Sequence, residues 1–110
     1  MATNFKNKIV KDAGILPIDL LSPTSPIDIT VIGIAITNTT VTEVSVSITI
    51  MDDTSVEAFY VKDVLVPVGS SLRVISNGEK LIIPPDYILR AYSTQNDSLD
   101  IIISYVERGA

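Results

Sequence analysis

Acidic residues are the side chains of this 110-residue chain best suited to chemistry, because Cys, His and Trp are all absent. Without thiols and imidazoles, the chain can form no thiolate or imidazole metal site, no cysteine nucleophile and no Ser-His-Asp triad. What remains is oxygen chemistry, in which a hard cation needs several oxygen ligands in one place. Two acidic clusters could begin such a site, and each also has a plainer interpretation.

The first cluster, Asp52-Asp53, directly follows a strand-like run. Two carboxylates are too few for Ca²⁺, whereas aspartate is common in turns because its side chain bonds nearby backbone amides. The second cluster, Asn96, Asp97 and Asp100, is similar to a fragment of a calcium loop but lacks the glycine and distal glutamate of the EF-hand pattern. We interpret both clusters as turns, and we predict no catalytic, cofactor or metal site.

Two carboxylates across a cleft could also hydrolyse a glycoside, and a sugar-binding groove usually adds aromatic platforms. The chain has four tyrosines and two phenylalanines. Tyr87 and Tyr105 fall in apolar rows and are expected in the core. Tyr92 falls on the opposite row from Tyr87 and is expected at an interface, where an aromatic ring with one polar tip is favoured. An enzyme is therefore the weakest of the functions considered.

Charge is distributed unevenly along the chain, whose 13 acidic and 8 basic residues give a net charge of −5. Nucleic-acid-binding domains are usually basic, so nucleic acid is not an expected partner. Three lysines lie close to the N-terminus, and the next basic residue is Lys62. We predict that residues 1–12 form a basic arm or edge strand, either solvated or docked on an acidic neighbouring subunit. The candidate partner-binding residues are Phe5, Lys6, Lys8, Lys11 and Tyr92.

The strand pattern is clearest in residues 43–50, where four apolar residues alternate strictly with Glu, Ser, Ser and Thr. This period of two predicts a half-buried strand. Residues 29–37 are apolar on both predicted faces, with Ile32, Ile34 and Ile36 expected together on one of them. A strand of that kind is covered on both sides, and in so small a domain the second cover could come from another subunit.

Turn sequences separate the other strands. Asn77-Gly78 predicts a hairpin, since both residues tolerate positive φ, and residues 94–98 are predicted to join the last two strands as a polar hairpin loop. Gly33, inside a strand, is interpreted as a packing or close-approach position rather than a ligand contact. Ile, Val and Thr favour sheet over helix. Seven or eight short strands predict an all-β fold, an antiparallel β-sandwich or jelly-roll-like single domain over residues 13–110.

The N-terminus is polar and lacks an apolar segment followed by a cleavage site, so no signal peptide is expected. No run approaches the ~20 apolar residues that cross a membrane, so a membrane is not an expected partner. The two Asn-x-Ser/Thr sequons, at residues 38–40 and 96–98, are accordingly interpreted as turn sequences.

Seven short strand-and-turn motifs follow one another over nearly the whole chain: FKNKIVKD (5–12), VIGIAITNTT (31–40), YVK (60–62), VPVGSSL (66–72), GEKL (78–81), DYI (86–88) and DIIISYVE (100–107). Their order resembles a family of small virion structural proteins of tailed bacteriophages, particularly phages of cyanobacteria and other aquatic bacteria. The chain departs from that family at residues 82–85, where similar proteins tend to have a glycine-containing turn.

The resemblance implies a β-sandwich subunit without catalytic activity, and our first expectation is a capsid cement or decoration protein. Such a subunit would bind the major capsid protein or other virion proteins as a homo-oligomer, with a trimer favoured. It would lie in the virion, on the capsid surface, after synthesis in the host cytoplasm. Apolar area removed from water, at ~25 cal/mol/Å² and repeated over many copies, would stabilise the shell. Residues 1–12 would be a docking strand that acts by β-augmentation.

Two alternatives to a capsid cement protein stay open. Within the virion, the chain could be a neck, tail or baseplate-fibre component. From another class, it could be a carbohydrate-binding module on a sandwich scaffold, although the sequence offers few aromatic platforms. The mean hydropathy of +0.41 favours a subunit that hides apolar surface in an assembly.

Overall fold

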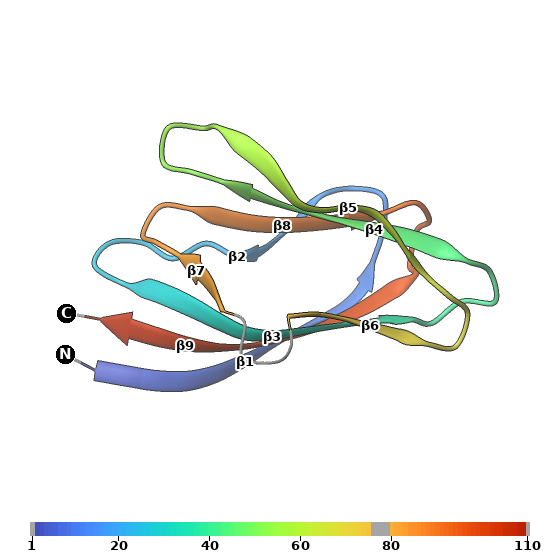
Figure 1. Ribbon diagram of the computed structural model, residues 1–110, viewed down its shortest axis with the longest axis horizontal. Coiled ribbons are helices and arrows are strands. Elements are labelled where there is room, and N and C mark those ends of the chain that lie inside the picture. Colours follow the sequence, from blue (N-terminus) through green and yellow to red (C-terminus); the bar gives the residue numbers. More distant parts are fainter. Residues whose placement is uncertain (1, 76–79, 110) are drawn as a thin grey trace.

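Figure 1 shows the computed structural model, which describes residues 2–75 and 80–109 as two facing layers of β-strands. No helix is present in these two ranges. The predicted all-β, antiparallel sandwich is therefore confirmed. The nine strands are β1 (Ala2–Ala13), β2 (Ile18–Leu21), β3 (Asp28–Asn38), β4 (Val44–Met51), β5 (Glu57–Val66), β6 (Ser71–Ile75), β7 (Leu81–Ile83), β8 (Ile88–Ser93) and β9 (Leu99–Gly109).

The strands pair as a long hairpin that has been rolled up. β1 pairs with β9, β2 with β8, β3 with β6 and β7, and β4 with β5, so the partners are nested around the β4–β5 turn. Two further pairs, β3 with β9 and β4 with β8, complete the sheets β1-β9-β3-β6 and β2-β8-β4-β5. This winding is that of a jelly roll, in which β6 and β7 share one edge of β3.

The rolled topology overturns two predicted hairpins. β6 pairs with residues 34–37 of β3 and β7 with residues 29–31, so these strands follow one another along β3 instead of pairing together. The dipeptide Asn77-Gly78 itself lies outside the described residues. Residues 94–98 connect β8 in one sheet with β9 in the other, and so form a crossing between sheets rather than a hairpin loop. A local turn signal cannot tell a hairpin from a crossing, because both need the chain to reverse.

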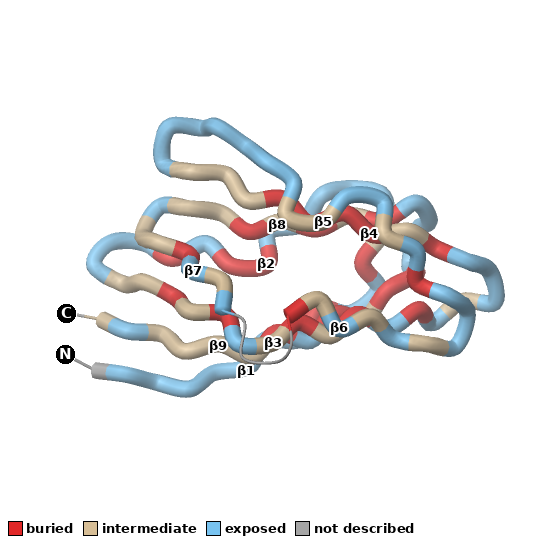
Figure 2. Tube along the Cα trace, in the orientation of Figure 1, coloured by how far each residue is buried: buried red, intermediate tan, exposed pale blue. Residues whose placement is uncertain are grey.

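The core lies between the two inner sheet faces, where Figure 2 shows most of the buried segments. β4 follows its predicted alternation on this side, with Val44, Val46 and Ile48 buried. β9 contributes Leu99, Ile101 and Ile103 to the same core. Branched aliphatic side chains make up most of this core, so burial of apolar area is the main source of stability.

A β-bulge in β3 changes which isoleucines face the core. Val31 lies opposite Tyr105 and Gly33 opposite Ser104, so Ile32 is an extra residue without a partner in β9. The inward positions therefore shift by one across the bulge. Val31 and Ile34 are both buried, while Ile32 is exposed. The predicted row of Ile32, Ile34 and Ile36 is wrong at Ile32, because a strict period of two cannot include an inserted residue.

Buried polar groups close one end of the sandwich. Asn38, at the end of β3, is 3 % exposed. Its Nδ2 donates to the carbonyl oxygens of Thr42 (2.8 Å) and Val66 (3.0 Å), and its Oδ1 accepts from the backbone N–H (2.8 Å) and the hydroxyl (2.7 Å) of Thr40. The amide thus ties the ends of β3 and β5 to the β3–β4 loop. The sequon at residues 38–40 is a turn sequence, as interpreted, and its asparagine is enclosed.

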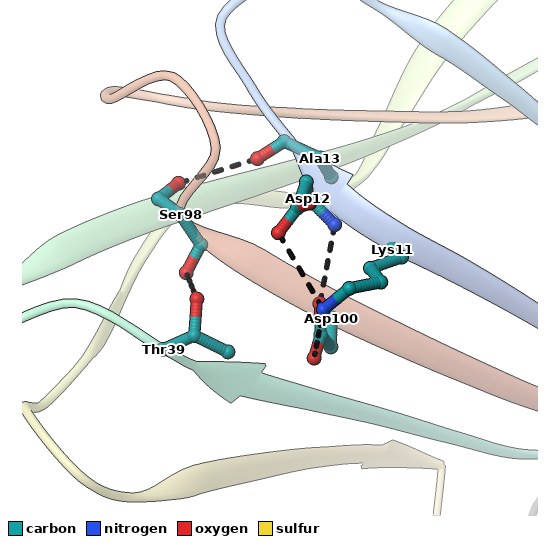
Figure 3. Close-up of polar contacts among 6 residues, drawn as sticks. All are labelled: Lys11, Asp12, Ala13, Thr39, Ser98 and Asp100. Atoms are coloured by element: carbon teal, nitrogen blue, oxygen red, sulfur yellow. Dashed lines mark hydrogen bonds and ion pairs between the residues drawn. The ribbon is translucent and has the colours of Figure 1, made fainter.

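The crossing before β9 is held in a similar way (Figure 3). The Ser98 hydroxyl donates to the carbonyl oxygen of Ala13 at 3.3 Å, and the Thr39 hydroxyl donates to the carbonyl oxygen of Ser98 at 3.2 Å. The backbone N–H groups of Ser98 and Thr39 donate to the same two oxygens, each at 3.0 Å. Ser98 is completely buried, and its hydroxyl lies 2.9 Å from that of Ser93. These bonds join the ends of β1, β3 and β8 at the start of β9.

Asn38→Asp is expected to destabilise the protein. A carboxylate cannot donate the two hydrogen bonds to Thr42 and Val66, and it places a charge in a closed site, so the expected loss is about 1–3 kcal/mol of unfolding free energy. Urea denaturation at pH 7 measures it. Asn7→Asp is the matched control, because Asn7 is exposed and makes only a 3.4 Å contact with Ser104. Equal stability of the two variants would contradict the assigned role.

Candidate functional site

The outer face of the β1-β9-β3-β6 sheet carries two apolar rows. Ile101 and Ile103 point into the core, so Ile102 between them points outward. Ile102 lies opposite Ile9 of β1 on one side and Ala35 of β3 on the other. A second row crosses the same face and consists of Phe5, Val106, Thr30 and Ile82. We call the two rows together the apolar outer face.

The large side chains of this face are well exposed. Phe5 is 80 % exposed, Ile9 69 %, Ile82 56 % and Ile102 44 %. Single exposed apolar residues are common on protein surfaces, but apolar rows in register across several strands mark a surface that another body covers. Of the second face expected for residues 29–37, Gly33 and Ala35 point outward, whereas Val31 is buried in the core. Within the described residues, no strand covers the apolar outer face.

A shallow depression of about 260 Å³ lies on this face beside Gly33, Arg73 and Ser104. A Cβ added at Gly33 would meet only the Cβ of Ser104, at 4.0 Å, which is an ordinary contact. Packing within the chain thus gives no close approach that would require a glycine here. Small residues, Gly33, Ala35 and Ser104, line this depression in the middle of the apolar outer face.

The basic N-terminal residues lie in a fully formed edge strand, because β1 pairs with β9 almost throughout its length. Lys6 Nζ donates to Glu107 Oε1 at 2.9 Å, and this hydrogen bond, together with the charge of Glu107, raises the pKa of Lys6. Lys11 Nζ lies 3.9 Å from Asp12 Oδ1 and 4.0 Å from Asp100 Oδ2 (Figure 3). These two lysines thus have acidic partners inside the chain.

The five candidate partner-binding residues do not form one site. Phe5 lies on the apolar outer face, whereas Lys6 and Lys8 alternate with it and point to the opposite side of β1. Lys11 lies at the bulge that ends the regular β1 register. Tyr92 lies on the outer face of the other sheet, opposite Ser47 of β4. Tyr87 and Tyr105 pack against the core, as predicted.

Ile9, Ile82 and Ile102 were not predicted to form part of an exposed apolar surface. The available signal was the unbroken apolar run at residues 101–103, in which a strand must present one side chain to each face in turn. This run does not predict that outward side chains of neighbouring strands lie side by side. That depends on strand register, which pairs residues as far apart in the sequence as Ile9 and Ile102.

Asp52 forms a turn at the tip of the central hairpin, as interpreted. Its Oδ1 accepts hydrogen bonds from the Thr54 hydroxyl (2.7 Å), the Thr54 N–H (2.8 Å) and the Val56 N–H (3.0 Å). These bonds favour the ionised carboxylate and lower the pKa of Asp52. Ser55 completes the turn with a φ of 68°. The Asp52 carboxylate therefore stabilises the backbone of this turn.

Side chains of residues 96–100 also accept hydrogen bonds from the backbone. Asn96 Oδ1 accepts from the N–H of Ile15 at 3.3 Å, and Asp100 Oδ1 accepts from the N–H of Asp12 at 3.1 Å. Asp97 has a φ of 51°, as the crossing requires. Within residues 2–75 and 80–109, no group of three or more acidic side chains is placed to hold a metal ion.

No protein-family model, curated protein or solved structure matches the chain. In the described part of the chain, no helix has the length and apolar character to cross a membrane.

Asp52→Ala is expected to lower Tm at pH 7, with less effect in acid. The folded-state pKa lies below the ordinary value of 3.8. The carboxylate therefore stabilises the fold fully above that ordinary value, and the stabilisation disappears as pH falls through the folded-state pKa. Thermal unfolding between pH 7 and pH 2 measures the difference from the wild type, with Asp53→Ala as the control. An undiminished difference at pH 2 would contradict an ionic contribution.

Proposed function

We propose that this chain is a non-enzymatic structural subunit of a tailed-bacteriophage virion, and most specifically a capsid cement or decoration protein. The observation that carries the proposal is the apolar outer face, which the isolated chain leaves in water. The virion setting is supported by the resemblance of the strand-and-turn motifs to small virion proteins. The paired strands hold these side chains in register on one face of the sheet.

The mechanism is burial of this face against a neighbouring subunit. Phe5, Ile9, Ile82 and Ile102 would leave water together, and each Å² of apolar area contributes ~25 cal/mol. A stable interface buries about 800 Å² on each partner. We propose that copies of this chain, with a trimer favoured, and the major capsid protein supply the cover. Many such contacts on the capsid surface would oppose separation of the shell proteins.

The edge of β1 has a separate role in this proposal. β1 is the last strand of its sheet, so one of its sides presents backbone groups that no strand among residues 2–75 and 80–109 pairs. Lysines on an edge strand discourage uncontrolled pairing with other chains. We assign Lys6, Lys8 and Lys11 to this protection, and we assign docking to the apolar outer face. A specific partner strand could still add to β1 by β-augmentation in the assembled virion.

A neck, tail or baseplate-fibre component is the second possibility within the virion. Such a subunit would use the same apolar outer face. The two possibilities therefore differ in the protein that this face binds, a capsid protein or a tail protein. Cosedimentation with empty capsids and with isolated tails separates them, because a cement protein pellets with the capsids only.

Ile9→Lys is expected to reduce the mass of the purified oligomer and to abolish its attachment to empty capsids. A charge in the middle of an apolar interface must be desolvated, which costs several kcal/mol when it is left unpaired. Light scattering measures the mass, and cosedimentation measures attachment. Val41→Lys is the matched control, because Val41 is 90 % exposed in the loop between β3 and β4.

These single substitutions test the interface more specifically than removal of residues 1–12, which would also disturb the fold. Deletion would remove most of β1, including the buried Val10, and would expose the edge of β9. The virion proposal would be refuted if the wild-type chain is a monomer and cosediments with neither capsids nor tails. Equal effects of Ile9→Lys and Val41→Lys would refute the assignment of the interface to the apolar outer face.

A further inference from the structure

The outer face of the β2-β8-β4-β5 sheet contains a trough along β4. Ser47 and Thr49 alternate with the core residues of β4 and therefore point outward, yet they are only 1 % and 6 % exposed. Larger side chains on both neighbouring strands rise above them. We call this hollow the β4 trough and define it by Pro17, Ser47, Thr49, Glu57, Ala58, Phe59, Arg90 and Tyr92.

Cross-strand register places the walls of the β4 trough. Arg90 of β8 lies opposite both Asp19 of β2 and Thr49 of β4, and Thr49 lies opposite Phe59 of β5. One row of side chains thus crosses all four strands. In the next row, Tyr92 stands opposite Ser47. Small hydroxyl residues therefore form the floor, and long or aromatic side chains form the two walls.

A fixed polar network lines one part of the trough. Arg90 Nε lies 2.7 Å from Asp19 Oδ1, and Arg90 Nη1 lies 3.7 Å from Glu57 Oε2. The Thr49 hydroxyl donates to Glu57 Oε2 at 2.7 Å. These contacts link side chains from all four strands of the sheet. Donors and acceptors that already contact one another need less ordering when a ligand binds.

Aromatic and apolar groups complete the site. Phe59 is 49 % exposed, with Lys62 Nζ 5.2 Å from the centre of its ring. Tyr92 is half-buried on the opposite wall, and Pro17 closes one side. The hollow measures about 180 Å³. Ring faces beside fixed charged groups are a combination that suits a ligand with both C–H faces and hydroxyl groups.

We propose that the β4 trough binds a neutral glycan, with one sugar ring seated between Tyr92 and Phe59. The C–H face of the ring would pack on these aromatic side chains, and its hydroxyl groups would bond to Glu57 and Arg90. Binding is noncovalent, and no bond of the glycan is broken.

Two observations favour a sugar over other ligands. β4 and β8 are inner strands of their sheet and pair on both sides, so a peptide could not add to them as a further strand. Recognition must therefore come from side chains. The charged groups around the trough are Asp19, Glu57 and Asp63 against Lys62 and Arg90, which gives a local charge of −1 (2 − 3). This near balance disfavours an anionic polymer.

The site is independent of the proposed assembly interface. The β4 trough and the apolar outer face lie on opposite outer surfaces of the sandwich (Figure 1), so both can be occupied at once. A virion subunit built in this way would present a glycan site to the surroundings while its other face is buried. The inference goes beyond the proposed function, and either can fail without the other.

The test is an NMR titration of the ¹⁵N-labelled full chain with cellohexaose, maltohexaose and xylohexaose, and with polygalacturonate as the anionic comparison. We expect saturable shifts, for at least one neutral oligosaccharide, at the amides of residues 47–49, 57–59 and 90–92. Tyr92→Ala and Phe59→Ala should each weaken binding about tenfold, which corresponds to 1.4 kcal/mol. Val41→Ala, in the loop between β3 and β4 and outside both surfaces, is the control and should bind like the wild type.

Variants are compared only after circular dichroism and thermal unfolding show that they are folded. Tyr92→Phe keeps the ring and should bind more tightly than Tyr92→Ala, which separates stacking from the loss of a hydroxyl group. The proposal is overturned if none of the neutral oligosaccharides shifts these amides, if only polygalacturonate does, or if Tyr92→Ala and Phe59→Ala bind as tightly as Val41→Ala. Light scattering of the same samples reports on the assembly interface separately.

Discussion

One constraint governs this structure: a two-layer sandwich of about 110 residues can cover only one face of each sheet. The rolled hairpin brings the two inner faces together and buries Ile34, Ile48, Ile101 and Ile103 between them. Because side chains alternate along a strand, every residue buried in this core determines that its neighbours face outward. The outer surfaces are therefore a direct consequence of the core. The two surfaces differ in character only because the residues between the core positions differ.

Exceptions to strict alternation occur where the sandwich must bend or close. The bulge at Ile32 lets β3 keep both of its halves in the core, although one residue is added on the way. At the closed end, Asn38 and Ser98 replace apolar packing by hydrogen bonds: Asn38 joins the ends of β3 and β5, and Ser98 joins the ends of β1 and β3. Such buried polar groups are tolerable because each is satisfied, and they hold the crossings in one arrangement. The acidic turn at Asp52 does the same for the tip of the rolled hairpin.

The two outer faces offer two kinds of contact. On the β1-β9-β3-β6 sheet, one row pairs Ile9 with Ile102 and a second row contains Phe5, Val106 and Ile82, and together they form a largely apolar surface. On the β2-β8-β4-β5 sheet, small hydroxyl residues lie between long side chains, which produces a hollow with charged and aromatic walls. An apolar surface suits contact with another protein, and a hollow with polar groups suits a small hydrophilic ligand. The two proposed roles, assembly and glycan binding, would thus use opposite sides of one scaffold.

The sequence by itself determined the all-β class, the buried row of β4 and the interpretation of both acidic clusters as turns. These depend on residue type and on spacing within one segment, so local patterns are enough to predict them. Tertiary structure alone decided the rest. It placed Ile9 beside Ile102, Arg90 between Asp19 and Thr49, and it turned two expected hairpins into successive strands and a crossing. The physical reason is that register joins residues far apart in the chain, and a shift of one residue would turn each side chain to the other face.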